Sequence, residues 1–291
     1  MAFKSGTIGY LELVITSIIW GVTYVLMKYS LSFLSPQQIA FARFLIAGII
    51  FVPLLLVMKE RYSRRELLIM IVVALTGVLL YQLLFIWGES GLSAGNASFI
   101  VSFEPIFIAV LGISLRRDQL RWTILIGLVI STIGMVVLLK PTSLRWSELL
   151  SAVLVLLSAL SWGIFTVVGK DMLVKHNPLS VTGYVSVIGL VMLLPFVNSG
   201  MISLFQIRNV YLIVSLLFIG VFATFIGYLL WFDGLKKVKP ITAGTTLYIT
   251  PFVTVIFASI LIFEPISLTT IIGGTVILVG LAVMGIKERK K

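Results

Sequence analysis

The stretch "WGVTYVLMKYSLSFLSP" (20–36) returns later in the chain as "WGIFTVVGKDMLVKHNP" (162–178). At this offset of 142 residues, 162 against 20, the two stretches align without a gap, and after a four-residue insertion the offset becomes 146. The sequence therefore contains an internal duplication. The residues that coincide are Trp20/Trp162, Gly21/Gly163, Val25/Val167, Lys28/Lys170, Leu31/Leu173, Pro36/Pro178, Pro53/Pro195, Leu83/Leu229, Leu84/Leu230, Gly88/Gly234, Ala97/Ala243, Pro105/Pro251, Gly127/Gly273 and Gly134/Gly280.

The composition identifies the solvent in which the two halves fold. Apolar residues make up 59% of the chain, charged residues make up 11%, and the mean hydropathy is +1.16. A soluble domain is about 45–50% apolar and about 25% charged, so this is a membrane protein. Apolar stretches of about 20 residues, which span about 30 Å of hydrocarbon, recur along the whole chain. They predict ten transmembrane helices at about 8–29, 36–58, 67–88, 94–115, 120–139, 149–172, 178–198, 209–232, 240–263 and 267–286.

The basic residues are distributed unevenly between the two ends of these predicted helices. If the N-terminus is cytoplasmic, 17 of the 22 lysines and arginines fall on the cytoplasmic side, 4 fall on the opposite side, and Arg43 lies inside a span. This asymmetry follows the positive-inside rule and predicts a multi-pass plasma-membrane protein with both termini in the cytoplasm. The net charge of +11 is then explained by topology and by contacts with membrane lipids, and no nucleic-acid partner is expected.

The predicted fold is an all-α membrane protein with ten transmembrane helices as two inverted five-helix repeats, at 1–141 and 142–291, within one membrane domain. Because each repeat has an odd number of spans, the second repeat must run through the membrane in the opposite direction. Inverted repeats are a transporter architecture with the substrate site near the midplane. The alternative is a duplication with a purely structural outcome, since fold alone does not establish function.

Several predicted spans carry polar side chains at depth. Such groups prefer the interior of a bundle, so the faces that carry them are expected to converge on a cavity. For one threonine or tyrosine alone, a local hydrogen bond to its own helix or to a neighbouring helix is the alternative. The predicted substrate or ion pathway consists of Trp20, Tyr24, Arg43, Tyr81, Gln82, Asn96, Glu104, Trp162, Thr166, Thr246, Tyr248 and Thr250.

Glu104 and Arg43 are charged residues inside predicted spans. A charge at the centre of a membrane helix costs about 2.5–3.5 kcal/mol on insertion scales, so both charges need compensation. Their predicted depths, about 15 Å and about 10 Å below the outer helix ends, allow them to pair. Three interpretations stay open. The two form a structural ion pair; Glu104 binds a proton or an amine while Arg43 meets a carboxylate; or either residue faces a wide, water-filled vestibule.

Two prolines occupy equivalent positions in the two halves. Pro105 and Pro251 each remove one backbone hydrogen bond within a predicted span, which bends the helix. Paired bends in inverted positions suit two gates that alternate, one for each face of the membrane. The alternative is a static kink that fits neighbouring helices.

Glycines mark two predicted spans as framework. Gly127 and Gly134 lie seven residues apart in 120–139, and Gly273 and Gly280 do so in 267–286. Seven residues are two helical turns, so each pair forms a flat strip that predicts close helix packing.

The order of these motifs resembles the EamA-type ten-helix family of the drug/metabolite transporter superfamily. The likeness rests on "RF" (43–44), on "SAGNASFI" (93–100) leading to Pro105, and on "AGTTLYITPFV" (243–253) followed by "FEP" (263–265). It implies a basket-like bundle in which the fifth and tenth helices lie outside a central cavity, and it implies carriage of small metabolites, often export of amino acids. In the place of the family's acidic residue after the fourth and ninth helices stand Asp118 and Glu264, interpreted as helix-end caps or gate anchors.

The predicted function is a secondary transporter of small polar metabolites that works by alternating access, exporting amino acids or related amines, with the proton as a candidate coupling ion. Alternatives are an uncoupled channel-like facilitator and a transporter of anionic metabolites through Arg43. The chain has no cysteine, and its single histidine, His176, falls in a connection. No enzymatic activity, cofactor or metal site is therefore expected.

Overall fold

The computed structural model describes residues 2–58, 60–115, 122–139, 146–196, 204 and 207–285. These residues form helices and connections without a strand, which confirms the predicted all-α class. The α-helices are α1 (Ala2–Ser30), α2 (Pro36–Met58), α3 (Arg64–Ala74), α4 (Tyr81–Ser90), α5 (Ala94–Val101), α6 (Glu104–Ser114), α7 (Trp122–Leu139), α8 (Trp146–Met172), α9 (Pro178–Leu193), α10 (Val210–Leu217), α11 (Gly227–Lys237), α12 (Pro240–Thr246), α13 (Ile249–Leu261) and α14 (Leu268–Gly285). A 3₁₀ turn, η2 (Leu194–Phe196), follows α9, and two π-helical segments, η1 (Leu75–Leu80) and η4 (Phe218–Ile226), join α3 to α4 and α10 to α11.

In the described part of the chain, eight helical segments are long and apolar enough to cross a membrane. Two shorter apolar stretches, Leu125–Gly134 and Leu268–Gly280, lie within α7 and α14. The chain is thus a multi-pass membrane protein, while ten crossings stay a prediction. The eight segments are Ser5–Ser30, Pro36–Met58, Arg64–Ser90, Ala94–Ser114, Glu148–Met172, Pro178–Phe196, Val210–Lys237 and Pro240–Leu261.

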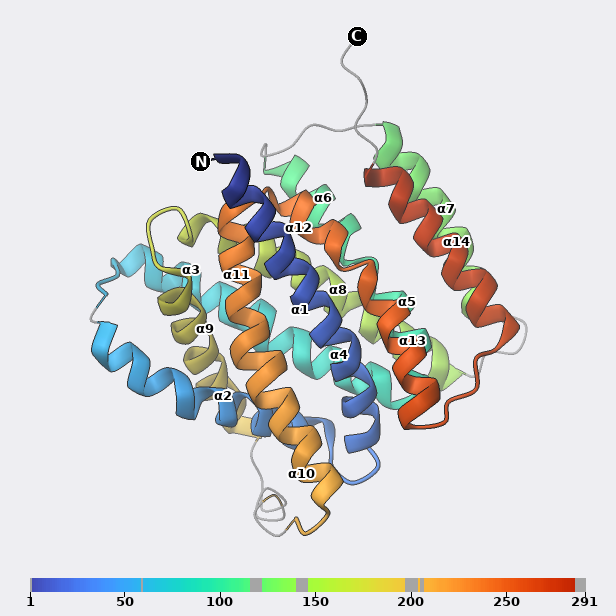
Figure 1. The fold of residues 1–291 in the computed structure, drawn as a ribbon, viewed down its shortest axis with the longest axis horizontal. Coiled ribbons are helices and arrows are strands. Elements are labelled where there is room, and N and C mark those ends of the chain that lie inside the picture. Colours follow the sequence, from blue (N-terminus) through green and yellow to red (C-terminus); the bar gives the residue numbers. More distant parts are fainter. Residues whose placement is uncertain are drawn as a thin grey trace.

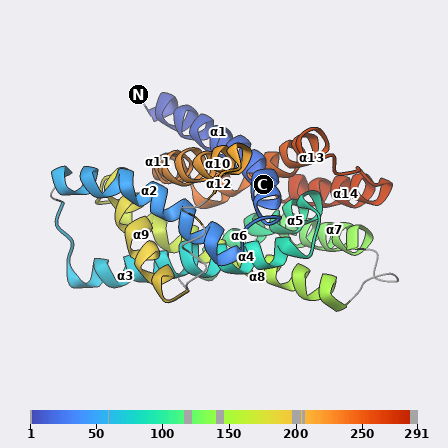
Figure 2. The same ribbon diagram turned by 90° about the horizontal axis from the view of Figure 1, so that it is seen from below.

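The helices form two layers, and each layer mixes the two halves of the chain (Figure 1, Figure 2). One layer holds α1 beside α11, α12 and α13, and the other holds α8 beside α3, α4 and α6. Helix α1 packs on α11 and α13, and α8 packs on α4 and α6. At the offsets of 142 and 146 residues these are the same contacts made twice. Each half therefore buries its first helix against the other half.

Lys28 and Lys170, which are equivalent in the two halves, make the same contact with the C-terminus of a helix. The Lys28 ammonium, at the end of α1, donates to the carbonyl oxygens of Glu89 (3.0 Å), Ser90 (3.4 Å) and Leu92 (2.5 Å). The Lys170 ammonium, at the end of α8, donates to the carbonyl oxygens of Leu235, Lys236 (3.0 Å) and Val238 (2.9 Å). The acceptors are offset by 146 residues throughout. Each lysine satisfies the free carbonyls at the C-terminus of a helix, α4 or α11, and complements its dipole.

The π-helical segments also recur in both halves. Shifted by 146 residues, η1 falls on 221–226, inside η4. The Thr224 hydroxyl donates to the Ile219 carbonyl, five residues earlier, at 2.8 Å. Such segments inside α-helices often accompany functional sites. Here they precede α4 and α11, which both reach the centre of the molecule.

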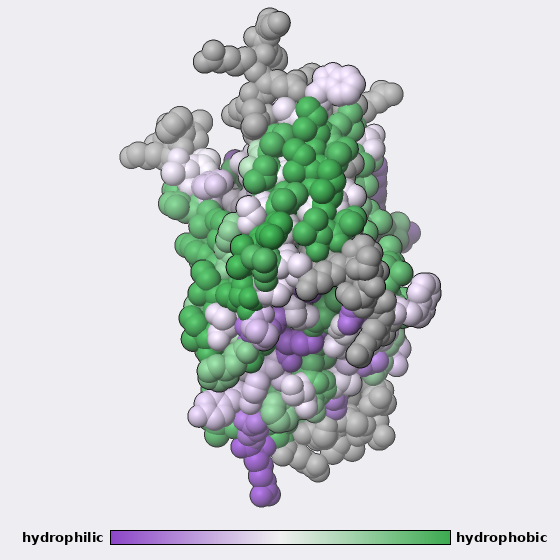
Figure 3. Space-filling model, turned by 90° about the vertical axis from the view of Figure 1, so that its right-hand side faces the viewer, coloured by the Kyte–Doolittle hydropathy of each residue, from purple (hydrophilic) through white to green (hydrophobic). Residues whose placement is uncertain are grey.

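Helices α7 and α14 pack against each other at one edge of the bundle, as the glycine spacing predicts (Figure 1). The Ser131 hydroxyl donates to the Ile277 carbonyl at 3.1 Å, and a methyl group added at Gly280 would lie 2.6 Å from the Gly127 carbonyl oxygen. On the outer face of this pair Val129 and Ile271 are exposed. Hydrophobic side chains cover much of this side of the molecule, which suits contact with lipid (Figure 3).

We expect Gly280→Ala to destabilise the protein by about 1–3 kcal/mol, because the added methyl group forces the α7 and α14 backbones apart. Thermal unfolding of the purified protein measures the effect. Gly6→Ala is the matched control, since a methyl group there meets nothing within 4 Å. Equal melting temperatures for the two variants would contradict a close α7–α14 contact.

Candidate functional site

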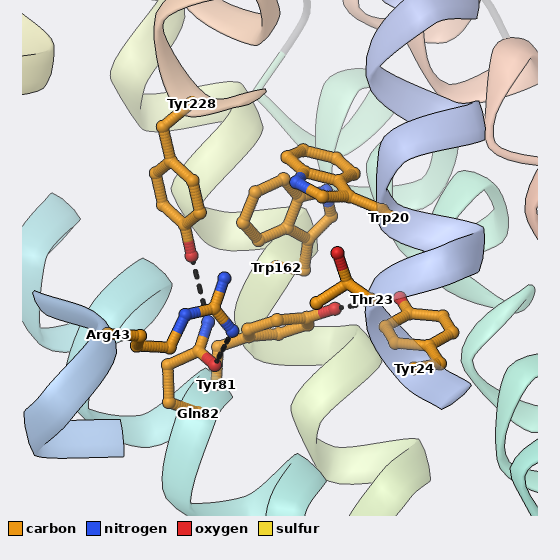
Figure 4. A pocket seen from close by; sticks show the side chains of 8 residues that line it. All are labelled: Trp20, Thr23, Tyr24, Arg43, Tyr81, Gln82, Trp162 and Tyr228. Carbon is orange, nitrogen blue, oxygen red and sulfur yellow. Dashed lines mark hydrogen bonds between the residues drawn. The ribbon is translucent and has the colours of Figure 1, made fainter. Parts of the chain in front are cut away.

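A narrow pocket lies where helices of both halves meet (Figure 4). The free space within it totals about 250 Å³, with room for about one water molecule. Five elements contribute its walls: α1, α2, α4, α8 and α11. The lining residues are Trp20, Thr23, Tyr24, Arg43, Tyr81, Gln82, Trp162 and Tyr228.

Arg43 is the charged residue of this pocket and is only 3% exposed. Its Nε donates to the Thr224 hydroxyl at 2.8 Å, and its Nη1 donates to the Gln82 amide oxygen at 2.6 Å (Figure 4). The Gln82 amide nitrogen donates to the Tyr228 hydroxyl at 2.9 Å, which donates to the Gly77 carbonyl at 3.0 Å. Nη2 forms no hydrogen bond among the described residues. The guanidinium is thus held on two sides and keeps a further donor edge.

Aromatic rings form most of the remaining wall. The rings of Trp20 and Trp162 meet edge to face with centroids 5.1 Å apart, and Tyr81 lies 4.8 Å from Trp162. Trp20 and Trp162 are equivalent residues of the two halves, so their contact lies close to the axis that relates the halves. The pocket is therefore at the centre of the duplicated fold, where the polar pattern places a cavity.

The two equivalent tryptophans differ in their hydrogen bonding. The Trp20 indole donates to the Ala223 carbonyl at 3.0 Å. The equivalent acceptor for Trp162 would be the Gly77 carbonyl, which instead accepts from Tyr228. Within the described residues, the buried Nε1 of Trp162 has no hydrogen-bond partner. Trp20 is thus hydrogen-bonded to a neighbouring helical segment, whereas Trp162 presents a donor without a partner at the pocket wall.

Glu104 lies beside the pocket and is 3% exposed. Its carboxylate interacts with the Tyr81 hydroxyl, which lies 3.2 Å from the Tyr24 hydroxyl, and its Oε1 has no hydrogen-bond partner among the described residues. No ion pair joins it to Arg43 in the described part of the chain. The tyrosines interact electrostatically with both charges. This conformation therefore lacks the direct ion pair that the depths of the two residues allow.

The other candidate residues lie away from this pocket. The Thr246 hydroxyl, in α12, lies 3.3 Å from the Ser17 hydroxyl of α1. The Thr250 hydroxyl, in α13, donates to the Ser17 carbonyl at 3.3 Å. Both threonines therefore connect their helices to α1. Hydrogen bonds to a neighbouring helix are part of the alternative raised for single threonines. The structure does not bring Asn96, Thr166 or Tyr248 to the pocket lining either.

The two prolines follow interruptions in their helices. The helix of the fourth predicted span is interrupted at 102–103, between α5 and α6, and Pro105 is the second residue of α6. The helix of the ninth predicted span is interrupted at 247–248, between α12 and α13, and Pro251 is the third residue of α13. The breaks lie within one residue of equivalent positions, while the gating role stays a prediction.

Glu264 caps a helix, as interpreted from the sequence: its Oε2 accepts from the backbone N–H of Ala94, the first residue of α5, at 3.1 Å. Asp118 lies outside the described residues.

Three polar residues of this region are missing from the sequence-based selection. Thr23 lines the pocket beside Tyr24, and Thr224 accepts a hydrogen bond from Arg43. Tyr228 is the equivalent of Gln82 at the 146-residue offset, so the duplication could have identified it. Thr224 carries no such indication, because its orientation depends on the π-helical register.

Polar groups close the bundle at the end where α1 begins. The Lys237 ammonium lies 2.6 Å from a Glu12 carboxylate oxygen and 2.9 Å from an Asp233 oxygen, which joins α1 to α11. Glu60, in the connection between α2 and α3, accepts from the Tyr62 hydroxyl at 2.9 Å and from the Asn177 backbone N–H at 3.2 Å. These contacts tie together connections from both halves.

Two helical repeats that pack their first helices against each other's half, around a central polar pocket, are an architecture typical of membrane transporters. The chain belongs to the EamA-like transporter family, whose model matches residues 7–140 and 149–286, once for each half. This confirms the family that the motifs indicate.

Individual relatives cover almost the whole chain. An uncharacterized transporter of Archaeoglobus fulgidus is 32% identical over 94% of this chain and 98% of its own length. A protein of Streptantibioticus cattleyicolor named "probable terminal-alkyne amino-acid exporter" is 24% identical over 92% of this chain and 90% of its own. A crystal structure with 17% sequence identity shares the fold, with a TM-score of 0.67 over 96% of both chains.

The Glu60 interactions predict a pH dependence of stability. Burial raises the pKa of the Glu60 carboxyl, but hydrogen bonds from Ser180, Tyr62 and Asn177 and the nearby His176 outweigh it, so the pKa is lowered. A lowered folded-state pKa gives stability above the unfolded value, about pH 4.3, that is lost as pH falls through the folded value. We expect Glu60→Gln to cost about 1 kcal/mol at pH 7 and nothing well below pH 4.

Thermal unfolding of wild type and Glu60→Gln between these pH values measures this loss. Glu148→Gln is the control, because none of the ion pairs between described residues involves Glu148. A cost for Glu60→Gln that stays constant over the whole pH range would contradict the prediction.

Proposed function

We propose that the protein is a secondary transporter that exports amino acids or related amines across the plasma membrane by alternating access. Ten spans, both termini in the cytoplasm and the absence of enzymatic activity belong to this proposal. The observation that carries it is the central pocket, where Arg43 offers an unused guanidinium edge while the unpaired Glu104 lies behind Tyr81. Opposite charges that do not neutralise each other suit a zwitterionic cargo.

The pocket supplies matching groups for both ends of an amino acid. A cargo carboxylate fits the Nη2 edge of Arg43, since the hydrogen bonds of Arg43 to described residues come from Nε and Nη1, and the Nε1 of Trp162, a buried donor without a partner among the described residues. A cargo ammonium fits Glu104 and the hydroxyl groups of Tyr24 and Tyr81. The aromatic walls accommodate a small side chain, and an ammonium gains from contact with aromatic faces. The name of the Streptantibioticus relative supports amino-acid export.

The duplicated architecture supports alternating access. The narrow pocket has contacts on both sides: Lys237 with Glu12 toward one end, and Lys28 with the end of α4 toward the other. Because the halves are equivalent, rocking one set of helices against the other opens either end around the same pocket. The proton is the proposed coupling ion and Glu104 its proposed binding group, since intramembrane carboxyl groups mark ion pathways.

A second candidate is a transporter of anionic metabolites through Arg43. It is favoured by the absence of a Glu104–Arg43 ion pair, which leaves the guanidinium charge available. Reconstitution into lipid vesicles with an imposed pH gradient tests both candidates. Accumulation of a radiolabelled amino acid supports the proposal, accumulation of a dicarboxylate alone supports the second candidate, and counterflow without accumulation identifies an uncoupled facilitator.

We expect Glu104→Gln to abolish gradient-driven accumulation while leaving counterflow measurable, because the amide cannot take up a proton. One pH unit corresponds to about 1.4 kcal/mol, so with one proton exchanged per cargo molecule the wild type reaches about tenfold accumulation. Vesicle uptake of an amino acid with and without the gradient measures this. Normal transport by Glu104→Gln at every pH would refute the role of Glu104.

The equivalent tryptophans provide a matched pair of variants. Trp20→Phe removes the hydrogen bond to the Ala223 carbonyl, so we expect a loss of about 0.5–1.5 kcal/mol of stability from that bond. Trp162→Phe removes a donor without a protein partner, so we expect little loss from hydrogen bonding but about fivefold to tenfold weaker binding of the cargo carboxylate. Thermal unfolding and the half-saturating cargo concentration separate the two. Unchanged cargo binding in Trp162→Phe would remove Trp162 from the proposed site.

A further inference from the structure

Glu89 carries a buried carboxyl group that does not line the central pocket. It lies in the last turn of α4, with 0% of its surface exposed. Neither of its carboxylate oxygens has a hydrogen-bond partner among the described residues. Gln82, which does line the pocket, is seven residues earlier in the chain. Two helical turns, about 10 Å, therefore separate Glu89 from the pocket.

The duplication shows that the helix end needs no carboxylate here. Lys28 caps α4 through backbone carbonyl oxygens, and Lys170 caps α11 in the same way. The residue of α11 equivalent to Glu89 is Leu235, also 0% exposed. A leucine thus fills the same position in an otherwise matching contact. The Glu89 carboxyl group is an addition to the shared architecture.

Among the described residues the titratable groups that act electrostatically on Glu89 are Lys28 and Tyr24 of α1 and Glu264, which follows α13. The Lys28 ammonium is occupied by three carbonyl oxygens and forms no ion pair with the Glu89 carboxylate within the described residues. The Glu264 carboxylate accepts a hydrogen bond from the first backbone N–H of α5.

The other elements that pack on α4 bring few further charges. Helix α2 carries Arg43, which is bonded to Gln82 two turns away, and α8 carries Glu148 in its first turn, while α5 has no ionisable residue. Among the described residues no side chain donates a hydrogen bond to Glu89; the Lys28 ammonium favours a negative charge there and the Glu264 carboxylate opposes one.

A charged carboxylate in this environment is unfavourable. Burial of an ion without hydrogen bonds costs so much that such groups adopt their neutral form instead. Proton uptake converts the Glu89 carboxylate into a neutral acid, with the proton on one carboxyl oxygen. The neutral acid retains only the smaller cost of an unsatisfied polar group, about 1–3 kcal/mol.

We propose that Glu89 is a second proton-binding site of this protein, separate from the central pocket and occupied while α4, α1 and the Glu264 connection are packed together. Separation of these elements admits water to the carboxyl group and releases the proton at the end of the bundle where α1 terminates. Proton release from Glu89 then accompanies opening of that end. The link to opening rests on the proposed transport cycle, whereas the bound proton does not.

Infrared spectroscopy of the full-length protein in lipid detects the bound proton through the C=O stretching band of a protonated carboxyl group. The comparison uses Glu104→Gln and the double variant Glu104→Gln/Glu89→Leu, so that Glu104 cannot contribute. Leucine is the substitution because Leu235 already occupies the equivalent position. We expect the double variant to lose the band of one carboxyl group at neutral pH, with a melting temperature that is equal or higher because leucine removes the cost of an unsatisfied polar group.

Identical carboxyl bands in the two proteins would overturn the proposal. A Glu89-dependent band that forms only after sodium is removed from the buffer would assign the site to a metal cation and would also overturn it. If the leucine variant does not fold, Glu89→Gln in the same Glu104→Gln background gives the same comparison. Because the measurement needs no cargo, its failure and a failure of the transport assays are distinguishable.

Discussion

The contact between Trp20 and Trp162 is the point around which the rest of the structure is arranged. Two equivalent residues can touch only where the two halves of a duplicated fold meet, and this contact joins α1 and α8 with ring centroids 5.1 Å apart. Helices α11 and α13 pack on one of these central helices, and α4 and α6 pack on the other. Any change in how α1 and α8 cross must move both layers together.

Function is concentrated where the halves differ around this contact. Arg43 has Val185 as its equivalent, Gln82 has Tyr228, and Glu104 has Thr250. Both buried charges near the pocket thus come from the first half, while the second half supplies the neutral partners Tyr228 and Thr224. A symmetric bundle provides a pathway that can open to either side, and an asymmetric lining gives its cargo a defined orientation.

Much of this arrangement could be predicted because it depends on periodic or repeated features. The apolar lengths predict the helical membrane class, and the glycine spacing predicts the α7–α14 contact. The partners of Arg43 could not be predicted, since they depend on which way each helix faces. Depth along a helix placed Arg43 and Glu104 within reach of each other, but depth says nothing about rotation around the helix axis.

The exchange of first helices between the halves has a consequence for how the protein is made. Trp20 is synthesised long before Ala223, its hydrogen-bond acceptor 203 residues later in the chain, and Glu12 precedes Lys237 by 225 residues. Helix α1 must therefore wait in the bilayer with an unpaired carboxylate near its end and an unpaired indole until the ribosome has nearly finished. Contacts this distant in sequence slow folding and expose partly assembled chains. A nascent chain cut short before α11 lacks the partners of its first helix, which makes it a ready target for membrane quality control.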